Sequence, residues 1–535
     1  MSHFDLSSAI DGAFADNKGG RSYIMLDPIE KIVGSQSPAV KTDYEVLVIG
    51  SGFAGIGMGI KLKKIGIHNF AILEKASDLG GVWRDNTYPG LTVDIPALTY
   101  SFSFEQNPSW SSMYPPRAEL KQYADHCAEK YGVRSHIQFN KTVSKSVYDE
   151  GCNLWITHLD NGESITSRYL VSASGFLSTV QMPNIKGIND FKGKVMHTAR
   201  WDNHYDLTGK RVGFIGTGAT AIQLIPEIAP QVKSLVVYQR TAIWNLPKLD
   251  GPISEGVKKA FRYIPLFQRL SRFITVTIVD FAFMKIFMRY QGSERLRKWI
   301  ERKCREYICA QVKDPATQEK LTPKFDYGCK RPGFSNKYYA TFNRENVELV
   351  TTPIARITEK GIVTTDGQER EIDTLICATG YHSFKKGAMP TFGVYGKNGI
   401  DIGDFWEENR YSAFMGATVP NYPNYFLIFG PYSLSNSSYF GMIENQTLHV
   451  ARCLKAAQRR NANYIEVKKE SHDQDFQEVQ RQAKKTIFAL GNCAESNSYY
   501  YDRHGDAPAV RPILGIETWW KTRLFSMDHY NFSAK

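Results

Sequence analysis

Two glycine-rich turns have the spacing with which a protein backbone receives a pyrophosphate. The first is Gly50-Ser51-Gly52-Phe53-Ala54-Gly55, and the second is Gly216-Thr217-Gly218-Ala219-Thr220-Ala221. In such turns the first glycine permits the tight bend, the second lets the phosphates approach, and the third position lets helix and strand pack closely. Alanine at the third position still permits that packing. The chemistry expected at both turns is the binding of a dinucleotide.

The residue that would meet the adenosine ribose differs between the two turns. Glu74 and Arg240 each lie 24 positions after the first glycine of their turn. A carboxylate accepts hydrogen bonds from ribose hydroxyls and repels a 2'-phosphate, whereas a guanidinium attracts that phosphate. The first turn therefore suits FAD or NAD and the second suits NADPH. A solvated surface arginine is the alternative interpretation of Arg240.

The elements around the turns predict an α/β protein with two Rossmann-like dinucleotide-binding domains. Short apolar runs at 44–49 and 211–215 precede the turns, and helical patterns follow them. A Phe- and Arg-rich helical block extends from about 254 to 312. We expect four parts: an N-terminal arm, a split FAD-binding domain, an NADPH-binding domain and a helical insertion. Their bounds, in that order, are 1–39; 40–178 with 385–535; 179–245 with 327–384; and 246–326.

Composition excludes several other classes of protein. Hydrophobic residues make up 42% of the 535 residues, which is typical of a globular protein. The net charge of +12 is as compatible with phosphorylated cofactors as with nucleic acid. Because no nucleic-acid motif accompanies that charge, we predict no nucleic-acid partner. The eight cysteines are scattered without a C-x-x-C pair, so we expect no disulfide framework, no metal site and no redox dithiol of a disulfide reductase. The first 20 residues lack the pattern of a signal peptide, and we expect a reduced, cytoplasmic setting.

The longest apolar stretch, 273–288, is interrupted by Asp280 and Lys285 and is too short to span a bilayer. It is either a buried helix or an amphipathic helix on a membrane surface. We expect burial, because membrane-surface helices usually show a cleaner polar face. Peripheral membrane contact stays open as the alternative.

Two longer motifs resemble the fingerprints of the Baeyer-Villiger monooxygenases. Residues 191–202, FKGKVMHTARWD, match F-x-G-x-x-x-H-x-x-x-W-[P/D] at every specified position. Residues 80–94, GGVWRDNTYPGLTVD, match G-G-x-W-x-x-x-x-Y-P-G-x-x-x-D. With the glycine turns, the stretch CATGY at 377–381 and KRPGFSNKYYATFNREN at 330–346, the resemblance extends from Tyr44 to Tyr381.

The resemblance implies a reaction and a set of site residues. NADPH would reduce FAD, and oxygen on the flavin, as a peroxyflavin, would be inserted beside a ketone carbonyl to give an ester or lactone. Arg331 would be the fixed cation of the closed site, and Asp94 would tune it. Lys330 and Arg240 would share the 2'-phosphate, with Thr241 alongside. Structural or solvated roles are the alternatives for these residues.

Three aromatic residues and one histidine, in or near the fingerprints, also receive roles from the resemblance. Trp83 and Tyr100 would pack near the flavin, although such residues are often simply core. His197 and Trp201 would serve the movement of one domain against the other, not acid-base chemistry. Loops at 430–438 and 496–506 would face the substrate, but they do not identify it.

Two further functions stay open at this stage. A flavin monooxygenase that acts on amines or sulfides would share the histidine motif, but usually has another aromatic residue in place of Trp201. A nucleotide-sensing or scaffold protein would need the glycine turns but not Arg331. The sequence does not predict the substrate or the oligomeric state.

Overall fold

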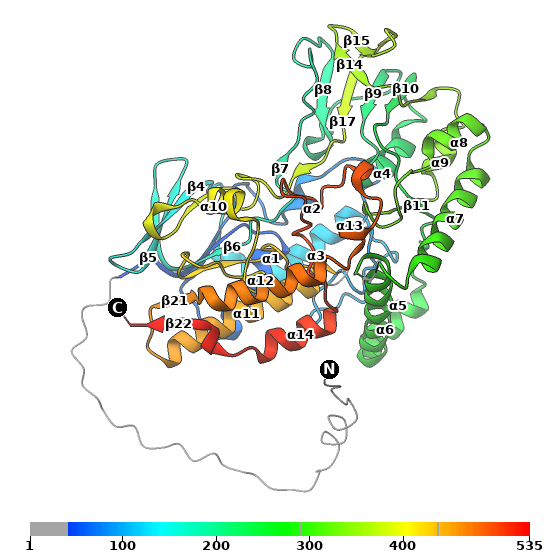
Figure 1. Cartoon of the computed structure of the whole chain (residues 1–535). Helices are drawn as coiled ribbons and strands as arrows, with labels where there is room; N and C mark the ends of the chain where they lie inside the picture. The colour runs from blue at the N-terminus through cyan, green and yellow to red at the C-terminus, as the bar shows by residue number, and fades with distance from the viewer. Residues whose placement is uncertain (1–40, 289, 436–437, 535) are drawn as a thin grey trace, which may run out of the picture. The chain divides into compact units, whose positions relative to one another are not determined.

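The computed structural model describes residues 41–288, 290–435 and 438–534 of the chain (Figure 1). Contacts group the chain from Thr42 onward into one compact unit. The predicted N-terminal arm, residues 1–39, lies outside the described residues.

The first glycine turn belongs to an eight-stranded sheet. Its order is β19-β4-β5-β6-β1-β2-β3, with β20 also paired to β6. The central strands β1, β2 and β6 are parallel, and β1 and β2 are apolar runs, as expected for strands covered on both faces. The bounds are β1 Tyr44–Ile49, β2 Phe70–Leu73, β3 Ile137–Gln138, β4 Val143–Asp149, β5 Leu154–Leu159, β6 Ser164–Ser172, β19 Gly393–Tyr395 and β20 Tyr425–Leu427.

Helix α1, Phe53–Lys64, starts directly after the first turn and is buried along most of its length. It packs against α3, Arg117–Lys130, and α11, Tyr439–Arg459. Because β19, β20 and α11 come from the C-terminal part of the chain, this sheet and its helices are built from two distant segments.

The second glycine turn belongs to a five-stranded, wholly parallel sheet with the order β13-β10-β9-β17-β8. Helix α4, Ala219–Ile228, follows the turn. A small antiparallel sheet, β14-β15-β16, follows β13 in the chain. The bounds are β8 Lys194–His197, β9 Arg211–Ile215, β10 Ser234–Tyr238, β13 Val347–Val350, β14 Ile354–Ile357, β15 Gly361–Thr364, β16 Glu369–Glu371 and β17 Thr374–Cys377.

The predicted helical block is helical, and Figure 1 labels its helices α5 to α8. A single turn of π-helix, η3, continues α6. The bounds are α5 Glu255–Tyr263, α6 Pro265–Phe283, η3 Met284–Met288, α7 Glu294–Gln311 and α8 Pro315–Leu321.

The expectation that the apolar stretch from Phe273 is buried is wrong. Most apolar side chains of α6 are exposed, and Gln268 is its one buried residue. The physical reason is that the polar face of α6 is the one that binds the rest of the protein. Its side chains donate hydrogen bonds to backbone carbonyls, which leaves the apolar face outward.

The remaining elements are short or lie near the C-terminus. Two small pairings, β7 with β18 and β11 with β12, join segments distant in sequence. Strands β21 and β22 form an antiparallel pair. The bounds are α2 Val82–Asp85, β7 Thr179–Val180, β11 Asn245–Leu246, β12 Gly333–Phe334, α9 Tyr338–Thr341, β18 Tyr381–His382, α10 Ile402–Asn409, β21 Tyr464–Val467, α12 Lys469–Ala483, α13 Ile487–Leu490, α14 Gly515–Leu524 and β22 Tyr530–Ser533; short 3-10 turns are η1 Arg134–His136, η2 Thr198–Arg200, η4 Lys397–Gly399, η5 Ala494–Ser496 and η6 Met527–His529.

One disulfide contradicts the expectation of a chain without disulfides. Cys329 and Cys493, 164 positions apart in the sequence, are bonded. Spacing along the chain could not reveal this pair, because the fold alone brings a loop after α8 beside the loop after α13. Among the described residues, no helix is long and apolar enough to cross a membrane.

Candidate active site

The first glycine turn is closed by contacts that leave no room for side chains. A Cβ on Gly55 would lie 1.9 Å from the carbonyl oxygen of Gly50, and a Cβ on Gly50 would lie 2.7 Å from that of Ala173. Gly50 also has a φ of 104°, which favours glycine. The turn therefore needs both residues as glycine, and the N-terminus of α1 begins where a pyrophosphate would be received.

Glu74 follows β2, beside this turn. Its Oε2 accepts hydrogen bonds from the backbone nitrogen and the hydroxyl of Ser51, at 3.0 and 2.8 Å, and Arg84 pairs with Oε1 at 3.0 Å. Burial raises the pKa of Glu74, but Arg84 and the hydrogen bonds outweigh it and hold that pKa below its ordinary value. The carboxylate is ionised and fixed, as a ribose acceptor must be.

The second turn repeats this geometry with one difference. Gly216 has a φ of 119°, and a Cβ there would lie 2.4 Å from the carbonyl oxygen of Ala378. A Cβ on Gly218 would meet nothing within 4 Å. The backbone at Gly218 is therefore approachable by a ligand, and α4 begins there.

Two cationic side chains, Lys330 and Arg240, lie together near this second turn. Burial, followed by the charge of Arg240, lowers the pKa of Lys330 to about 8. Within the described ranges, neither side chain has a hydrogen-bond or ion-pair partner. Neighbouring like charges without a counter-ion are what a phosphate dianion would neutralise.

Thr241, the third residue predicted at this position, is already engaged. Its hydroxyl accepts a hydrogen bond from Nδ2 of Asn497 at 2.9 Å, and its carbonyl accepts one from the Thr217 hydroxyl at 2.6 Å. Asn497 has a left-handed φ of 49°, in the loop after α13. The C-terminal segment thus reaches the second dinucleotide site, which the sequence did not predict.

Arg331 and Asp94 form a bidentate pair. Nε of Arg331 donates to Oδ2 of Asp94 at 2.8 Å, and Nη2 donates to Oδ1 at 2.9 Å. The charge of Asp94 raises the pKa of Arg331 well above its ordinary value. Burial raises the pKa of Asp94, but Arg331 outweighs it and lowers that pKa. About a third of each side chain is exposed, so a fixed cation faces an accessible space.

The other donors of Arg331 have no hydrogen-bond partner among the residues described. Tyr499 and Tyr500 are near enough to act on the pKa of Arg331. The C-terminal loop that contains these tyrosines therefore lies near the guanidinium. An anionic or developing negative oxygen placed there would receive its hydrogen bonds.

The Cys329–Cys493 disulfide lies close in sequence both to Arg331 and to the loop that contains Tyr499 and Tyr500. Cys329 is two residues before Arg331, and Cys493 is six residues before Tyr499. The bond ties the arginine's segment to the tyrosine loop. Sequence reasoning missed both cysteines, because neither has a neighbouring cysteine that would signal a pair.

Trp83 and Tyr100 lie near the first turn and contact each other. The indole nitrogen of Trp83 donates to the Tyr100 hydroxyl at 3.1 Å, and their rings meet edge to face. Tyr100 also packs on Phe53 of the first turn and on Phe440 of α11. These aromatic side chains form a wall beside the turn, a suitable boundary for a planar ring system.

The long fingerprint joins the two dinucleotide-binding parts. The Tyr88 hydroxyl donates to Oε1 of Gln223 in α4 at 3.0 Å, and Gln223 donates to the carbonyl of Thr92 at 3.0 Å. Gly90 has a φ of 77°, and a Cβ there would lie 2.9 Å from the carbonyl of Gln223. Tyr88 and Gly90 thus serve a close backbone crossing onto α4, and Asp94 follows four residues after Gly90.

His197 is buried at the end of β8. Its Nδ1 accepts a hydrogen bond from the backbone nitrogen of Ala199 at 3.1 Å. Burial, with a contribution from Arg200, lowers the pKa of His197 to about 4. The imidazole is neutral near pH 7 and caps a turn, which agrees with a structural role better than with acid catalysis. Trp201, half-buried, packs at the edge of the core that contains α4.

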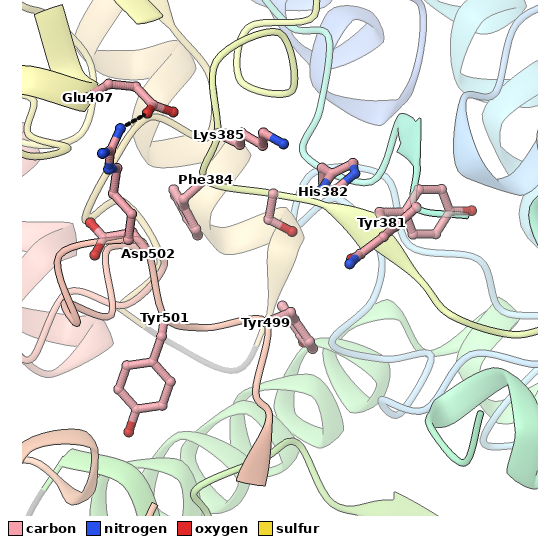
Figure 2. Close-up of a pocket in the computed structure, with 11 residues that line it drawn as sticks. Tyr381, His382, Phe384, Lys385, Glu407, Tyr499, Tyr501 and Asp502 are labelled. Carbon is pink, nitrogen blue, oxygen red and sulfur yellow. Dashed lines mark hydrogen bonds and ion pairs between the residues drawn. The ribbon is translucent and has the colours of Figure 1, made fainter. Parts of the chain in front are cut away.

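A cavity of about 410 Å³ opens near this site (Figure 2). Most of its lining comes from the stretch after β17 and from the C-terminal loop, and it includes Tyr381, Phe384, Tyr499 and Asp502. Tyr499 belongs both to this cavity and to the surroundings of Arg331. Arg503 pairs with Glu407 at its rim, so the loop is held there by an ion pair.

These features define a class: an oxidoreductase with paired dinucleotide-binding sites and an arginine held by a carboxylate near their junction. Residues 47–258 match the family model described as pyridine nucleotide-disulphide oxidoreductase. A Baeyer-Villiger monooxygenase of Pseudomonas aeruginosa is 37% identical over 458 residues, covering 85% of this chain and 86% of that protein. Cyclohexanone 1,2-monooxygenase of an Acinetobacter species is 34% identical and covers 84% and 89%.

Solved structures agree with these relatives. A complex of OTEMO with FAD and NADP has a TM-score of 0.81 at 27% identity, covering 92% of this chain and all of that one. Cyclohexanone monooxygenase of Rhodococcus sp. Phi1 bound to NADP+ has a TM-score of 0.81 at 28% identity, covering 92% and 99%. The chain belongs to the Baeyer-Villiger monooxygenase family. The predicted fold and the predicted class of flavoprotein monooxygenase are confirmed.

Proposed function

We propose that this enzyme binds FAD at the first glycine turn and NADPH at the second, and inserts one oxygen atom of O2 beside the carbonyl of a ketone to give an ester or lactone. The observation that carries the proposal is Arg331, fixed by Asp94 with its remaining donors free. Neither an ordinary dehydrogenase nor a nucleotide sensor needs such a cation.

The first site fits FAD. The Gly50 turn and α1 would receive the pyrophosphate, Glu74 would accept the ribose hydroxyls, and the Trp83 and Tyr100 wall would border the flavin. When bound, FAD takes a hydride from NADPH and carries the oxygen chemistry. The protein's part is to orient the two cofactors and to exclude water.

The second site fits NADPH in preference to NADH. Gly216, Gly218 and α4 would receive the pyrophosphate. Lys330 and Arg240 would hold the 2'-phosphate, with the Thr241 hydroxyl still able to donate. Asn497 would fix Thr241 from the other side.

Arg331 would supply a permanent positive charge where negative charge develops on the reacting oxygen and on the carbonyl. Asp94 positions the guanidinium through two parallel hydrogen bonds and so removes the need for reorganisation during the reaction. A lysine would present a point charge without this fork. His197 would take no proton in the cycle, because a pKa of about 4 makes it a weak base and its Nδ1 already accepts a hydrogen bond.

The assignment of domains forms part of the proposal. Residues 40–178 with 385–535 would bind FAD, 179–245 with 327–384 would bind NADPH, and 246–326 would be a helical insertion. Pairing of β19 and β20 with strands near the first turn supports the split of the FAD-binding part.

We also propose a cytoplasmic location, where NADPH is available. Disulfides there are usually transient, which makes the Cys329–Cys493 bond a candidate for reversible reduction.

The reaction is tested with the purified holoenzyme, NADPH and 18O-labelled oxygen against linear, cyclic and aromatic ketones, with a tertiary amine in parallel. We expect an ester or lactone that contains one labelled oxygen, formed from NADPH and not from NADH. If the amine alone is converted, to its N-oxide, the enzyme is a flavin monooxygenase of the other type and the proposal is wrong.

A further inference from the structure

Helix α6 is attached to the protein through its polar residues. Nε2 of Gln268 donates to the carbonyl of Asn107 at 2.9 Å, and Arg272 donates to the carbonyl of Leu98. The preceding helix α5 does the same, since Arg262 donates to the Ser109 hydroxyl at 3.0 Å. A helix that docks by its polar face must present its apolar face elsewhere.

The outward side of α6 is a long apolar stripe. Its members recur at helical spacing and are all exposed, Phe273 by 68% and Ile278 by 62%: Phe267, Leu270, Phe273, Ile274, Ile278 and Phe281. We name these six side chains the α6 face. At 1.5 Å per residue the 19-residue helix is about 28 Å long. The stripe along it is therefore an extended apolar surface, unlike the single exposed apolar residues that protein surfaces commonly carry.

Helix α14 carries a second exposed apolar group. Its members are Ile516, Trp519, Trp520 and Leu524. Glu444 of α11 is near enough to both helices to act on the pKa of Arg272 in α6 and of Arg523 in α14. Both helices therefore lie within electrostatic reach of the same carboxylate.

The helices that carry these apolar groups also carry basic residues. Lysine and arginine outnumber aspartate and glutamate in α5, in α6 and in α14. Arg262 and Arg272 are used in docking to the protein, whereas Lys259 and Arg269 are exposed. A cavity of about 290 Å³ near Glu444 is lined by Lys61, Lys64 and Arg523 together with Phe102 and Phe104. Exposed aromatic and aliphatic side chains with a basic border are the pattern of an interfacial helix on an anionic lipid surface.

We propose that the α6 face, together with α14, binds the protein peripherally to a membrane surface that contains anionic lipids. The helix would lie in the plane of the interface, and the exposed Lys259 and Arg269 would meet the headgroups. A second copy of this chain is the less favourable occupant, since a two-fold contact would bring the same positive borders against each other. The proposal goes beyond the oxygenation reaction and does not depend on its substrate.

The test is co-sedimentation of the FAD-loaded full-length protein with vesicles of phosphatidylcholine alone or mixed with an equal part of phosphatidylglycerol. We expect binding to the mixed vesicles that weakens with added salt. The double variant Phe273→Glu/Ile278→Glu should lose at least about tenfold in affinity, and the double variant Lys259→Glu/Arg269→Glu should lose binding to the anionic vesicles selectively.

Ile400→Glu is the matched control, because this exposed isoleucine lies between β19 and α10. It should bind vesicles as the wild type does. NADPH oxidation should be unchanged in all variants, since none of the altered residues lies in the site, and unchanged flavin content would verify folding.

Three results would overturn the proposal. The first is wild-type protein that does not bind the mixed vesicles. The second is a wild-type dimer that the Phe273→Glu/Ile278→Glu variant converts to a monomer in sedimentation velocity, which would identify a second copy as the occupant. The third is hydrogen exchange of residues 1–40 that is slow in the wild type and fast in that variant, which would show that this segment covers the face.

Discussion

The guanidinium of Arg331 and the carboxylate of Asp94 are joined by two hydrogen bonds, although 237 positions separate them in the sequence. Asp94 ends the long fingerprint that crosses onto α4, and Arg331 follows the disulfide cysteine Cys329. The pair therefore lies where the two dinucleotide-binding parts and the C-terminal loop come together. Its position depends on all three.

Asp94→Asn should lower the rate of ketone oxygenation about tenfold or more and lower NADPH oxidation less. The amide keeps the size of the side chain but loses the charge that fixes Arg331, and a hydrogen bond to a charged group contributes about 1.5–3 kcal/mol. Stopped-flow flavin reduction and ester yield, measured separately, check this. Asp94→Glu should restore part of the yield. An unchanged ratio of ester to NADPH in Asp94→Asn would show that Asp94 does not position the arginine.

Arg240→Ala should raise the KM for NADPH about tenfold or more and leave the KM for NADH nearly unchanged. The expected loss follows from removing one charge-assisted contact to the 2'-phosphate, of about 1.4 kcal/mol or more. Steady-state kinetics with both cofactors measures it. Arg356→Ala, at an exposed arginine of β14, is the control and should change neither value. Equal effects on both cofactors would contradict the assignment of Arg240.

Affinity for NADPH should fall as the pH rises through about 8. Burial and Arg240 lower the pKa of Lys330 to about 8, so the side chain is charged below that pH and neutral above it, and only the charged form attracts the phosphate. Titration of binding between pH 7 and 9 with NADPH and NADH tests this. The dependence should be absent for NADH and in Lys330→Met. A flat profile for NADPH would argue that Lys330 does not meet the phosphate.

Reduction of the Cys329–Cys493 bond should destabilise the protein. A bond that closes a loop of this length constrains the unfolded chain by about 5 kcal/mol in the chain-entropy model. Thermal unfolding with and without reductant measures the effect, and Cys329→Ser/Cys493→Ser should reproduce it. Cys309→Ser, at an exposed free cysteine, is the control. An unfolding midpoint that is insensitive to reductant would mean that the bond does not form in solution.

Much of the fold and of the site could be predicted because local sequence determines it. Gly50 and Gly216 occupy turns that only glycine fits, and Glu74 and Arg240 follow strands β2 and β10 at a fixed offset from those glycines. The pairing of Arg331 with Asp94 came from the family resemblance, since nothing local connects residues so far apart. Their hydrogen bonds are what the structure adds.

Other features depend on contacts that no local pattern encodes. The Cys329–Cys493 bond and the Asn497 contact to Thr241 form only when loops distant in sequence meet. The apolar residues of α6 predict a buried helix, because apolar residues in a helix usually mark the buried face, but they are exposed. Here Gln268 and Arg272 determine the docking face through hydrogen bonds to carbonyls.

The role of Arg331 is tested most directly by the product balance of Arg331→Ala. With NADPH, oxygen and a ketone that the wild type converts, we expect the variant to oxidise NADPH and consume oxygen while forming hydrogen peroxide and no ester. Arg356→Ala should keep the wild-type yield. Ester formation by Arg331→Ala at the wild-type ratio to NADPH would contradict the central role of this arginine.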